Sequence, residues 1–371
     1  MKQGWKTYRL GDICTLNYGK ALTATNRVTG DIPVYSSAGI TGSHNVALVQ
    51  SKGIIVGRKG TVGTVYYSDK PFYCIDTAYY ILPDDEKYDF KWLYYRLKSL
   101  HLDKLNEDSA VPGLNRETAY AQEFPLPGLA EQRRIAGILG AIDDKIENNR
   151  RINTNLELQA QALYKQWFVD NRSDDWEEKQ LGEIALHITD GVHNTVIDSP
   201  NGEYYLLSCK NIKSGQLFIG SNERRIDHET FTKLRKRTRL SHGDILVTSV
   251  GTVGEMYLVN ESPSNYEFQR SVAIIKPNND IISSYFLYAA LLYQQNEIKH
   301  LAHGAVQQCI FISDLKEYSL IVPNKDDISA FDAVVAPMFN KIGELQKENE
   351  TLATLRDTLL PKLMNGEIIT K

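Results

Sequence analysis

Two long stretches of the chain repeat apolar residues in alternating steps of four and three. One stretch follows Pro127 and the other follows Pro323, and each keeps the pattern for more than four heptads. This spacing predicts two long helices that pair through a coiled-coil seam, rather than ordinary surface helices. The seam positions are Ile135, Leu139, Ile142, Ile146, Asn149, Asn153, Leu156, Ala160, Leu163 and Trp167 in the first stretch, and Phe331, Val335, Met338, Ile342, Leu345, Asn349, Leu352, Arg356, Leu359 and Leu363 in the second.

Polar residues interrupt both seams at the same place. Asn153 and Asn349 occupy equivalent positions in the two stretches. A buried polar residue in a seam lowers stability but fixes the register of the helices, so we assign both residues to register. Pro337 lies inside the second stretch and predicts either a kink or a helix start nearby.

The segments that precede the long helices resemble each other, which indicates a duplication. Residues 5–13 (WKTYRLGDI) recur as residues 176–184 (WEEKQLGEI), and residues 54–63 (IIVGRKGTVG) recur as residues 245–254 (ILVTSVGTVG). The order of matching segments is kept, while their spacing grows along the chain, so the second copy contains insertions. We call the copies the first head and the second head. The predicted division is a first head at 1–128, a helix at 129–171, a second head at 172–324 and a helix at 325–371.

Within each head, short β-rich runs bounded by Gly and Pro predict strands, followed by an amphipathic helix and an extended, Pro-marked end. Strands that do not alternate strictly with helices indicate an α+β fold. We expect two similar mixed α/β heads separated by an antiparallel coiled coil of two long helices. The predicted strands are 32–34, 53–56, 63–67, 78–82, 244–247, 255–259 and 272–275, the helices 90–100 and 285–298, and the extended ends 123–127 and 318–323.

Antiparallel pairing of the two helices would place the heads at opposite ends. At ~1.5 Å per residue, roughly 35 helical residues span ~50 Å. Major-groove faces of B-DNA recur every ~34 Å. If the heads bind DNA, a coiled coil of this length is suited to hold them one helical turn, or slightly more, apart.

Composition narrows the class of protein. The 371 residues are 42% hydrophobic and 24% charged, which is ordinary for a soluble globular protein. No apolar run is long enough for a membrane span, and the start lacks a secretion signal pattern. The four cysteines, Cys14, Cys74, Cys209 and Cys309, form no C-x-x-C pair, so we expect no disulfide or metal site and a cytoplasmic location without membrane association.

Although the net charge of the chain is −4, one of its segments is strongly basic. Residues 224–239 contain seven Lys or Arg against Asp227 and Glu229, a net charge of +5. Neutralising DNA phosphates is the expected use of such a segment, and a solvated helix face is the alternative. The candidate DNA-binding residues in it are Arg235, Lys236, Arg237 and Arg239.

A glycine-punctuated turn supplies two more candidates. Arg58 and Lys59 lie in the turn at residues 57–63, and the second copy has Ser249 and Val250 in their places. The turn matches neither a Rossmann fingerprint nor a P-loop. The shared glycines are interpreted as structural, while the unshared cations are where DNA preference would differ between heads.

Polar loops supply the remaining candidates. Polar side chains in such loops are typical of contacts with DNA bases and equally typical of turns. An Asn side chain is suited to contact adenine. His193 follows an Asp-Gly bend, for which a polar turn is favoured over an acid–base or metal site. The loop candidates are Ser36, His44, His193, Lys210, Asn211 and Gln307.

Catalytic motifs are missing from the sequence. There is no G-x-S-x-G, no H-E-x-x-H and no Asn-Pro-Pro-aromatic tetrad typical of amino-methylating enzymes. The chain is therefore interpreted as a binder. Two alternatives stay open: an enzyme, as a fused polypeptide reduced to this chain, and an assembly scaffold whose heads bind two protein copies.

Several segments resemble type I restriction–modification specificity subunits over the whole chain. Residues 126–135 (LPGLAEQRRI), 139–152 (LGAIDDKIENNRRI) and 161–169 (QALYKQWFV) resemble the central region of that family. Residues 355–368 (LRDTLLPKLMNGEI) resemble its distal region. Residues 5–13 and 176–184 resemble the starts of its two target recognition domains.

The resemblance implies a non-catalytic subunit that carries no cofactor of its own. Each head would be a target recognition domain that recognises one half of a bipartite site in double-stranded DNA. Modification (methyltransferase) subunits with S-adenosylmethionine would methylate adenine in each half. Restriction (motor-nuclease) subunits with ATP and Mg²⁺ would join them for cleavage.

Overall fold

The structure, a computed structural model, describes residues 4–105, 113–220, 222–304 and 308–368. The chain separates into two compact units, Met1–Glu147 with Glu350–Lys371, and Asn148–Asn349. The long helices α4 (Leu129–Tyr164) and α10 (Lys325–Met364) each contribute to both units. The division of the sequence into four parts, with boundaries at 128, 171 and 324, stays a prediction.

Helices α4 and α10 pair in antiparallel fashion within each unit. In the second unit, Asn149 of α4 contacts Asn349, while the later Tyr164 contacts the earlier Phe331. In the first unit, Asp143 contacts Arg356. As the residue number on α4 rises, the number of the contacting residue on α10 falls, so the two helices are antiparallel. The predicted mixed fold, with two similar heads and a long central helix pair, is confirmed. Helix α4 continues into a π-helical turn at Lys165–Asp170.

Pro337 does not interrupt α10. The helix begins at Lys325 and stays continuous to Met364, so the predicted helix start near Pro337 is wrong. Asn324 explains the true start, because its side chain accepts a hydrogen bond from the amide of Asp327 at 2.9 Å and so caps the helix.

Among its described residues, the first head contains three sheets. Its first and last strands pair and close the head, with Lys6 opposite Leu126. A four-stranded sheet has the order β2-β8-β5-β6, and a three-stranded sheet has the order β4-β3-β7. The elements are β1 (Lys6–Arg9), α1 (Leu10–Ile13), β2 (Asn17–Tyr18), β3 (Ile32–Ser36), β4 (Gly39–His44), β5 (Gly53–Gly57), β6 (Val65–Ser68), β7 (Tyr73–Cys74), β8 (Ala78–Ile81), α2 (Phe90–Ser99), α3 (Arg116–Tyr120) and β9 (Glu123–Leu126), with 3₁₀ turns at Ala24–Asn26 and Leu102–Lys104.

The second head repeats these sheets in the same order. Its closing pair is β10-β20, its four-stranded sheet is β11-β19-β16-β17 and its three-stranded sheet is β15-β12-β18. In both heads the three-stranded sheet has one parallel pair, β3-β7 or β12-β18. The elements are β10 (Glu177–Gln180), α5 (Leu181–Ile184), β11 (Ala185–Asp190), β12 (Tyr204–Leu207), β13 (Ile212–Lys213), β14 (Gln216–Leu217), β15 (Arg225–Ile226), α6 (His228–Thr238), β16 (Ile245–Thr248), β17 (Met256–Leu258), β18 (Tyr266–Phe268), β19 (Val272–Pro277), α7 (Ser284–Tyr293), α8 (Gln295–His300), α9 (Ile312–Glu317) and β20 (Ser319–Val322), with a 3₁₀ turn at Cys209–Asn211.

The insertions that lengthen the second head are now visible. The hairpin β13-β14 and helix α6 lie between β12 and β16, where the first head connects β3 to β5 through β4 alone. The predicted strands of both heads correspond to observed strands. The predicted helix at 285–298 is divided at Gln294 into α7 and α8.

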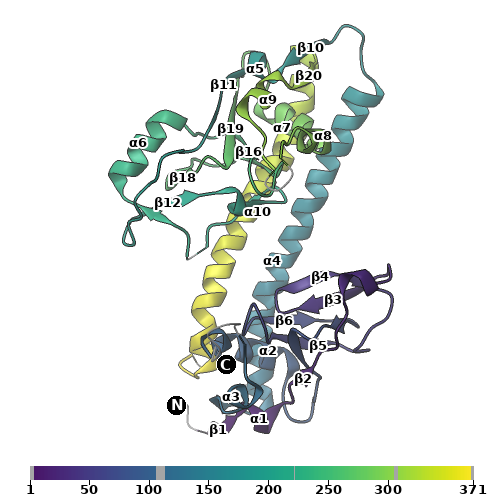
Figure 1. Ribbon diagram of the computed structural model, residues 1–371, viewed down its shortest axis with the longest axis vertical. Coiled ribbons are helices and arrows are strands. Elements are labelled where there is room, and N and C mark those ends of the chain that lie inside the picture. Colours follow the sequence, from purple (N-terminus) through teal and green to yellow (C-terminus); the bar gives the residue numbers. More distant parts are fainter. Residues whose placement is uncertain (1–3, 106–112, 221, 305–307, 369–371) are drawn as a thin grey trace. The chain divides into compact units, whose positions relative to one another are not determined.

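The apolar core of each unit joins a head to the long helices. Trp92 and Leu93 of α2 pack in one cluster with Ile135 and Leu139 of α4. Helix α2 starts where the Asp89 side chain accepts a hydrogen bond from the amide of Trp92 at 2.8 Å. In the second head, β16, β19 and α7 lie next to α10, whereas β12, β18 and α6 form the outer side (Figure 1). The outer side is therefore the part of this head that α4 and α10 leave accessible.

Candidate DNA-binding surfaces

The basic segment predicted from the sequence forms helix α6. Asp227 caps its first turn by accepting a hydrogen bond from the amide of Thr230 at 2.8 Å, and this hydrogen bond lowers the pKa of Asp227. Phe231 and Leu234 are buried on one face against the strands of the outer sheet. Arg239 ends the helix with a positive φ of 51°. The buried face fixes which side chains of the basic segment face solvent.

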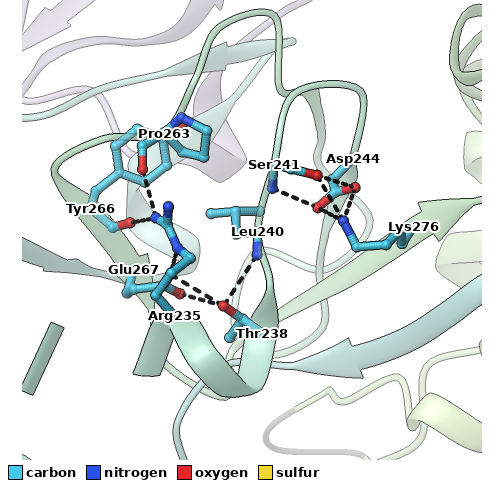
Figure 2. A network of polar contacts seen from close by, with 9 residues as sticks. All are labelled: Arg235, Thr238, Leu240, Ser241, Asp244, Pro263, Tyr266, Glu267 and Lys276. Carbon is cyan, nitrogen blue, oxygen red and sulfur yellow. Dashed lines mark hydrogen bonds and ion pairs between the residues drawn. The ribbon is translucent and has the colours of Figure 1, made fainter. Parts of the chain in front are cut away.

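Arg235 lies on the inner side of α6 and holds the helix to strand β18 (Figure 2). Its Nε donates to the carboxylate of Glu267, a side chain with no solvent exposure. Its Nη2 donates to the carbonyls of Pro263 at 2.6 Å and Tyr266 at 2.9 Å. Thr238 donates to the same carboxylate at 3.0 Å. Burial raises the pKa of Glu267 and Arg235 opposes that rise, so Arg235 serves primarily as an internal partner.

A second buried ion pair lies beside the first in the same network (Figure 2). Lys276 Nζ lies 2.7 Å from Asp244 Oδ1, and the backbone amide of Ser241 donates to Asp244 at 2.9 Å. Burial raises the pKa of Asp244, and the bonds from Lys276 and Ser241 oppose the rise. The two ion pairs fix the turn at 239–244 that connects α6 to β16.

Arg237 and His193 meet at one carboxylate. Arg237 Nη2 donates to Asp190 Oδ1 at 3.0 Å, and its Nη1 donates to the carbonyl of Gly191 at 2.9 Å. His193 Nε2 lies 2.6 Å from Asp190 Oδ2. The structure therefore brings two sequence-predicted residues together, although both are engaged within the head.

The exposed positive charge of α6 comes from three side chains. Lys233, Lys236 and Arg239 face solvent, and none forms an ion pair with a residue in the described part of the chain. Upstream, Arg224 is bonded to Asp198 and Arg225 to Gly202 and Tyr205. Of the seven cations in residues 224–239, these three are the ones free to meet an external anion.

Lys210 and Asn211 lie just before the inserted hairpin. Lys210 Nζ lies 3.0 Å from Glu223 Oε2 but keeps most of its surface exposed. Asn211 is buried, accepts a hydrogen bond from the amide of Ser208 and donates one to the carbonyl of Phe218. These bonds give Asn211 a local structural role, and Lys210 is the more accessible of the two.

In the first head, Arg58 and Lys59 follow strand β5. The guanidinium carbon of Arg58 lies 4.8 Å from the centre of the Tyr18 ring and 5.7 Å from that of Tyr79. Arg58 Nη1 also donates to the carbonyl of Asp76 at 3.2 Å. Lys59 is exposed. Both cations border one cavity, of about 430 Å³.

The other candidates of the first head lie on its three-stranded sheet. Ser36 is buried, donates to the carbonyl of Gly39 and accepts from the amide of Ala38, so it stabilises the turn between β3 and β4. His44 is half-buried and its Nδ1 accepts from the amide of Val28 at 3.0 Å. Gln307 lies outside the described residues.

Three residues that face these surfaces were not among the predicted sites. Tyr18 and Arg116 border the same cavity as Arg58, and Lys233 lies on the exposed side of α6. Lys233 belongs to the basic segment, so a count of charges along the sequence could have identified it. Tyr18 and Arg116 are isolated in sequence and carry no local signal.

Comparison with known proteins identifies the family. The family model for the type I restriction modification DNA specificity domain matches residues 2–158 and 173–350. The chain belongs to this family. It is 28% identical over 338 residues to the MjaIX specificity subunit of Methanocaldococcus jannaschii, covering 85% of this chain and 77% of that protein. It is 25% identical over 357 residues to the EcoBI specificity subunit of Escherichia coli, covering 86% and 74%.

A solved structure shares the fold of this specificity subunit. The S subunit of a type-I restriction-modification system from M. genitalium superposes with a TM-score of 0.57 at 20% identity, covering 99% of this chain and 97% of that one. The two family matches each begin near the first strand of a head and continue into the long helix that follows it. The family's repeated unit is thus a head together with its helix.

Asn153 and Asn349, which the sequence predicts to fix the register, lie in the seam of the second unit. Asn149 Nδ2 donates to Asn349 Oδ1 at 2.9 Å and to Glu348 Oε2 at 2.8 Å. Asn153 is buried and its Nδ2 lies 3.4 Å from the carbonyl of Ile342. Asn349 therefore pairs with Asn149, a seam residue that was not assigned to register, and the register role of Asn153 and Asn349 stays a prediction.

Neither a metal site nor a membrane span is found in the described part of the specificity subunit. No group of three or more His, Cys, Asp or Glu side chains in residues 4–105, 113–220, 222–304 and 308–368 is placed to hold a metal ion. No helix among the same residues is long and apolar enough to cross a membrane.

Proposed function

We propose that this chain is the DNA-recognition subunit of a type I restriction–modification complex, in which each head recognises one half of a bipartite duplex site. The duplicated topology is the observation that supports this most directly, because β2-β8-β5-β6 and β4-β3-β7 recur as β11-β19-β16-β17 and β15-β12-β18. Two copies of one fold suit two separate half-sites. Helices α4 and α10 would set the spacing between the half-sites and dock the modification subunits.

Helix α6 is proposed as a phosphate-binding element of the second head. Its exposed Lys233, Lys236 and Arg239 have no ion-pair partner among the described residues, and it lies on the outer side of the head (Figure 1). Cations that neutralise phosphates release counterions, which makes binding strongly salt-dependent. Arg235, anchored to Glu267, positions the helix for this contact.

The chemistry of methylation and cleavage is assigned to partners. The chain would carry no catalytic site. Modification subunits would supply S-adenosylmethionine, and restriction subunits would supply ATP and Mg²⁺. The expected location of the complex is the cytoplasm, where the DNA is.

The proposal is tested by mapping methylated adenines in cells that express this chain with its modification subunits. A bipartite motif is expected, with two specified halves and an unspecified spacer. Exchanging residues 1–127 for the equivalent head of a relative should then change one half of the motif and leave the other half unchanged.

Four results would contradict the proposal. A single contiguous motif, or an exchange that changed both halves, would show that the heads do not recognise separate half-sites. Binding of S-adenosylmethionine to the isolated chain would indicate an enzyme. Duplex binding that is absent or independent of salt would favour a protein scaffold.

A further inference from the structure

The first head contains a cationic cavity in which Arg58 and Lys59 meet residues from distant parts of the chain. The cavity has a volume of about 430 Å³ and is bordered by strand β2, the turn after β5 and the start of α3. Tyr18, Arg58, Lys59 and Arg116 contribute its aromatic and positively charged side chains. We call it the Arg58–Arg116 cavity.

The two arginines are held in place before any ligand arrives. The guanidinium carbons of Arg58 and Arg116 lie 4.8 Å and 5.2 Å from the centre of the Tyr18 ring. Arg116 also lies 5.8 Å from the ring centre of Tyr120, and Arg58 is bonded to the carbonyl of Asp76. Contact with an aromatic face orients a guanidinium without neutralising it. The donors of both arginines are therefore pre-oriented at little entropic cost on binding.

The charge at the cavity is only partly balanced. Among the described residues that border the cavity, Arg58, Lys59 and Arg116 are accompanied by one carboxylate, that of Glu117, whose side chain lies 3.7 Å from Arg116 and is 77% exposed. An exposed ion pair at this distance is weak. The cavity thus has an excess of positive charge and donors that fit tetrahedral anions.

We propose that the Arg58–Arg116 cavity binds a backbone phosphate of the DNA, a contact that rests on the proposed function and deepens it. A phosphate protrudes from the duplex and fits a concave site. Base edges lie at the floor of a groove and need a protruding side chain to reach them. Planar guanidinium groups form paired hydrogen bonds with phosphate oxygens.

The second head differs at each corresponding position. In the first head, strand pairing places Tyr18 opposite Tyr79. At the corresponding positions of the second head, it places Asp190 opposite Ala273. The bridge between Val250 and Cys309 corresponds to the bridge between Lys59 and Gly113. By the same correspondence, the second head has Ser249 at the position of Arg58 and Ile312 at the position of Arg116. The phosphate contact is therefore assigned to the first head.

The test compares the full chain with its R58A/R116A variant on a duplex that carries the methylated motif. Charge-assisted hydrogen bonds of this kind correspond to a loss of affinity of roughly 10- to 100-fold. The salt slope of binding should fall by about 0.9 for the one phosphate released. The loss should be the same for duplexes with single base changes in either half-site. R9A/K70A is the matched control, since Arg9 and Lys70 are exposed in the same head and carry the same charge.

Tyr18→Leu is the second variant, because Tyr18 is 47% exposed and its loss should leave the fold intact. It removes the ring that orients both guanidiniums while keeping their charge. The affinity for the duplex should fall less than in R58A/R116A, and the salt slope of binding should stay unchanged.

Each remaining outcome is decisive. Unchanged affinity and slope in R58A/R116A, with salt-dependent binding by the parent chain, would overturn the phosphate site alone. A loss confined to one base position would overturn it in favour of base recognition. A parent chain without salt-dependent duplex binding would overturn the proposed function and this inference together.

Discussion

The two heads place their cations in different ways on the same set of sheets. In the first head, Arg58 and Arg116 are oriented by the ring of Tyr18, which leaves their charge largely free. In the second head, Arg235 and Arg237 are bonded to the carboxylates of Glu267 and Asp190. The exposed charge of the second head comes instead from the other side of α6, an element that the first head does not possess among its described residues.

This difference shows which parts of the duplicated fold are free to vary. The closing pairs β1-β9 and β10-β20 and the sheet orders are the same in both heads. The connection from the three-stranded to the four-stranded sheet differs, being short after β4 and containing α6 after β15. A rigid set of sheets with variable connections allows each head to present a different surface to DNA.

The largest expected effect comes from removing the anchor of α6. Arg235→Ala leaves the carboxylate of Glu267 buried without its cation, and breaking a buried ion pair in this way destabilises by about 3–5 kcal/mol. Hydrogen exchange on the full chain should show faster exchange of amides in α6 and β18, with the first head unchanged. Uniform protection in the variant would show that Arg235 does not anchor the helix.

The matched control replaces both partners, as R235M/E267L. Exchange of a buried ion pair for apolar side chains of similar size is often close to neutral, so protection should be largely recovered. If the double variant is as unstable as Arg235→Ala, the loss comes from packing rather than from the unpaired carboxylate.

The same variant should respond to pH in a defined direction. Burial raises the pKa of Glu267, and without Arg235 to oppose it the pKa rises further. The folded state of Arg235→Ala then binds this proton more tightly than the unfolded chain does. Its stability relative to the parent should therefore improve as the pH falls toward the ordinary value for Glu, for example from about pH 8 to about pH 5.

An intermediate effect is expected in the seam. Asn153 is buried with one long hydrogen bond to the carbonyl of Ile342, so Asn153→Leu should raise the free energy of unfolding by about 1 kcal/mol. Asn349→Leu should lower it, because Asn149 loses one of its two acceptors. Thermal denaturation of the full chain measures both changes. Cysteine crosslinks between α4 and α10 should report a looser register in the double variant, and equal shifts of one sign in the single variants would contradict the distinction.

The periodic features of this fold could be predicted from sequence. The seam of α4 and α10 and the predicted strands depend on local patterns of apolar residues, and the duplication is visible in the repeated segments. The closing pair β1-β9 was not predicted, because strand pairing between residues as distant as Lys6 and Leu126 leaves no local signal. The break at Gln294 was not predicted either, because residues 284–300 contain no Gly or Pro that would mark the end of a helix.

The candidate sites were harder to predict for a related reason. A charge count treats Arg235 and Lys236 alike, yet neighbouring residues of a helix point about 100° apart, and only tertiary packing shows which one meets Glu267. The cavity of the first head joins Tyr18, Arg58 and Arg116 from three distant segments. Such a group exists only after the chain has folded.

The smallest expected effect concerns the exposed face of α6. Lys233→Ala and Lys236→Ala together should leave the stability of the second head unchanged, because both side chains face solvent. If each neutralises one phosphate, the logarithmic salt slope of duplex binding should fall by about 0.9 for each lysine, with equal loss for all duplex sequences. K325A/K341A removes the same charge from exposed positions of α10 and should leave the slope unchanged. An unchanged slope in K233A/K236A would show that α6 is a solvated helix and that the second head contacts DNA through its other loops.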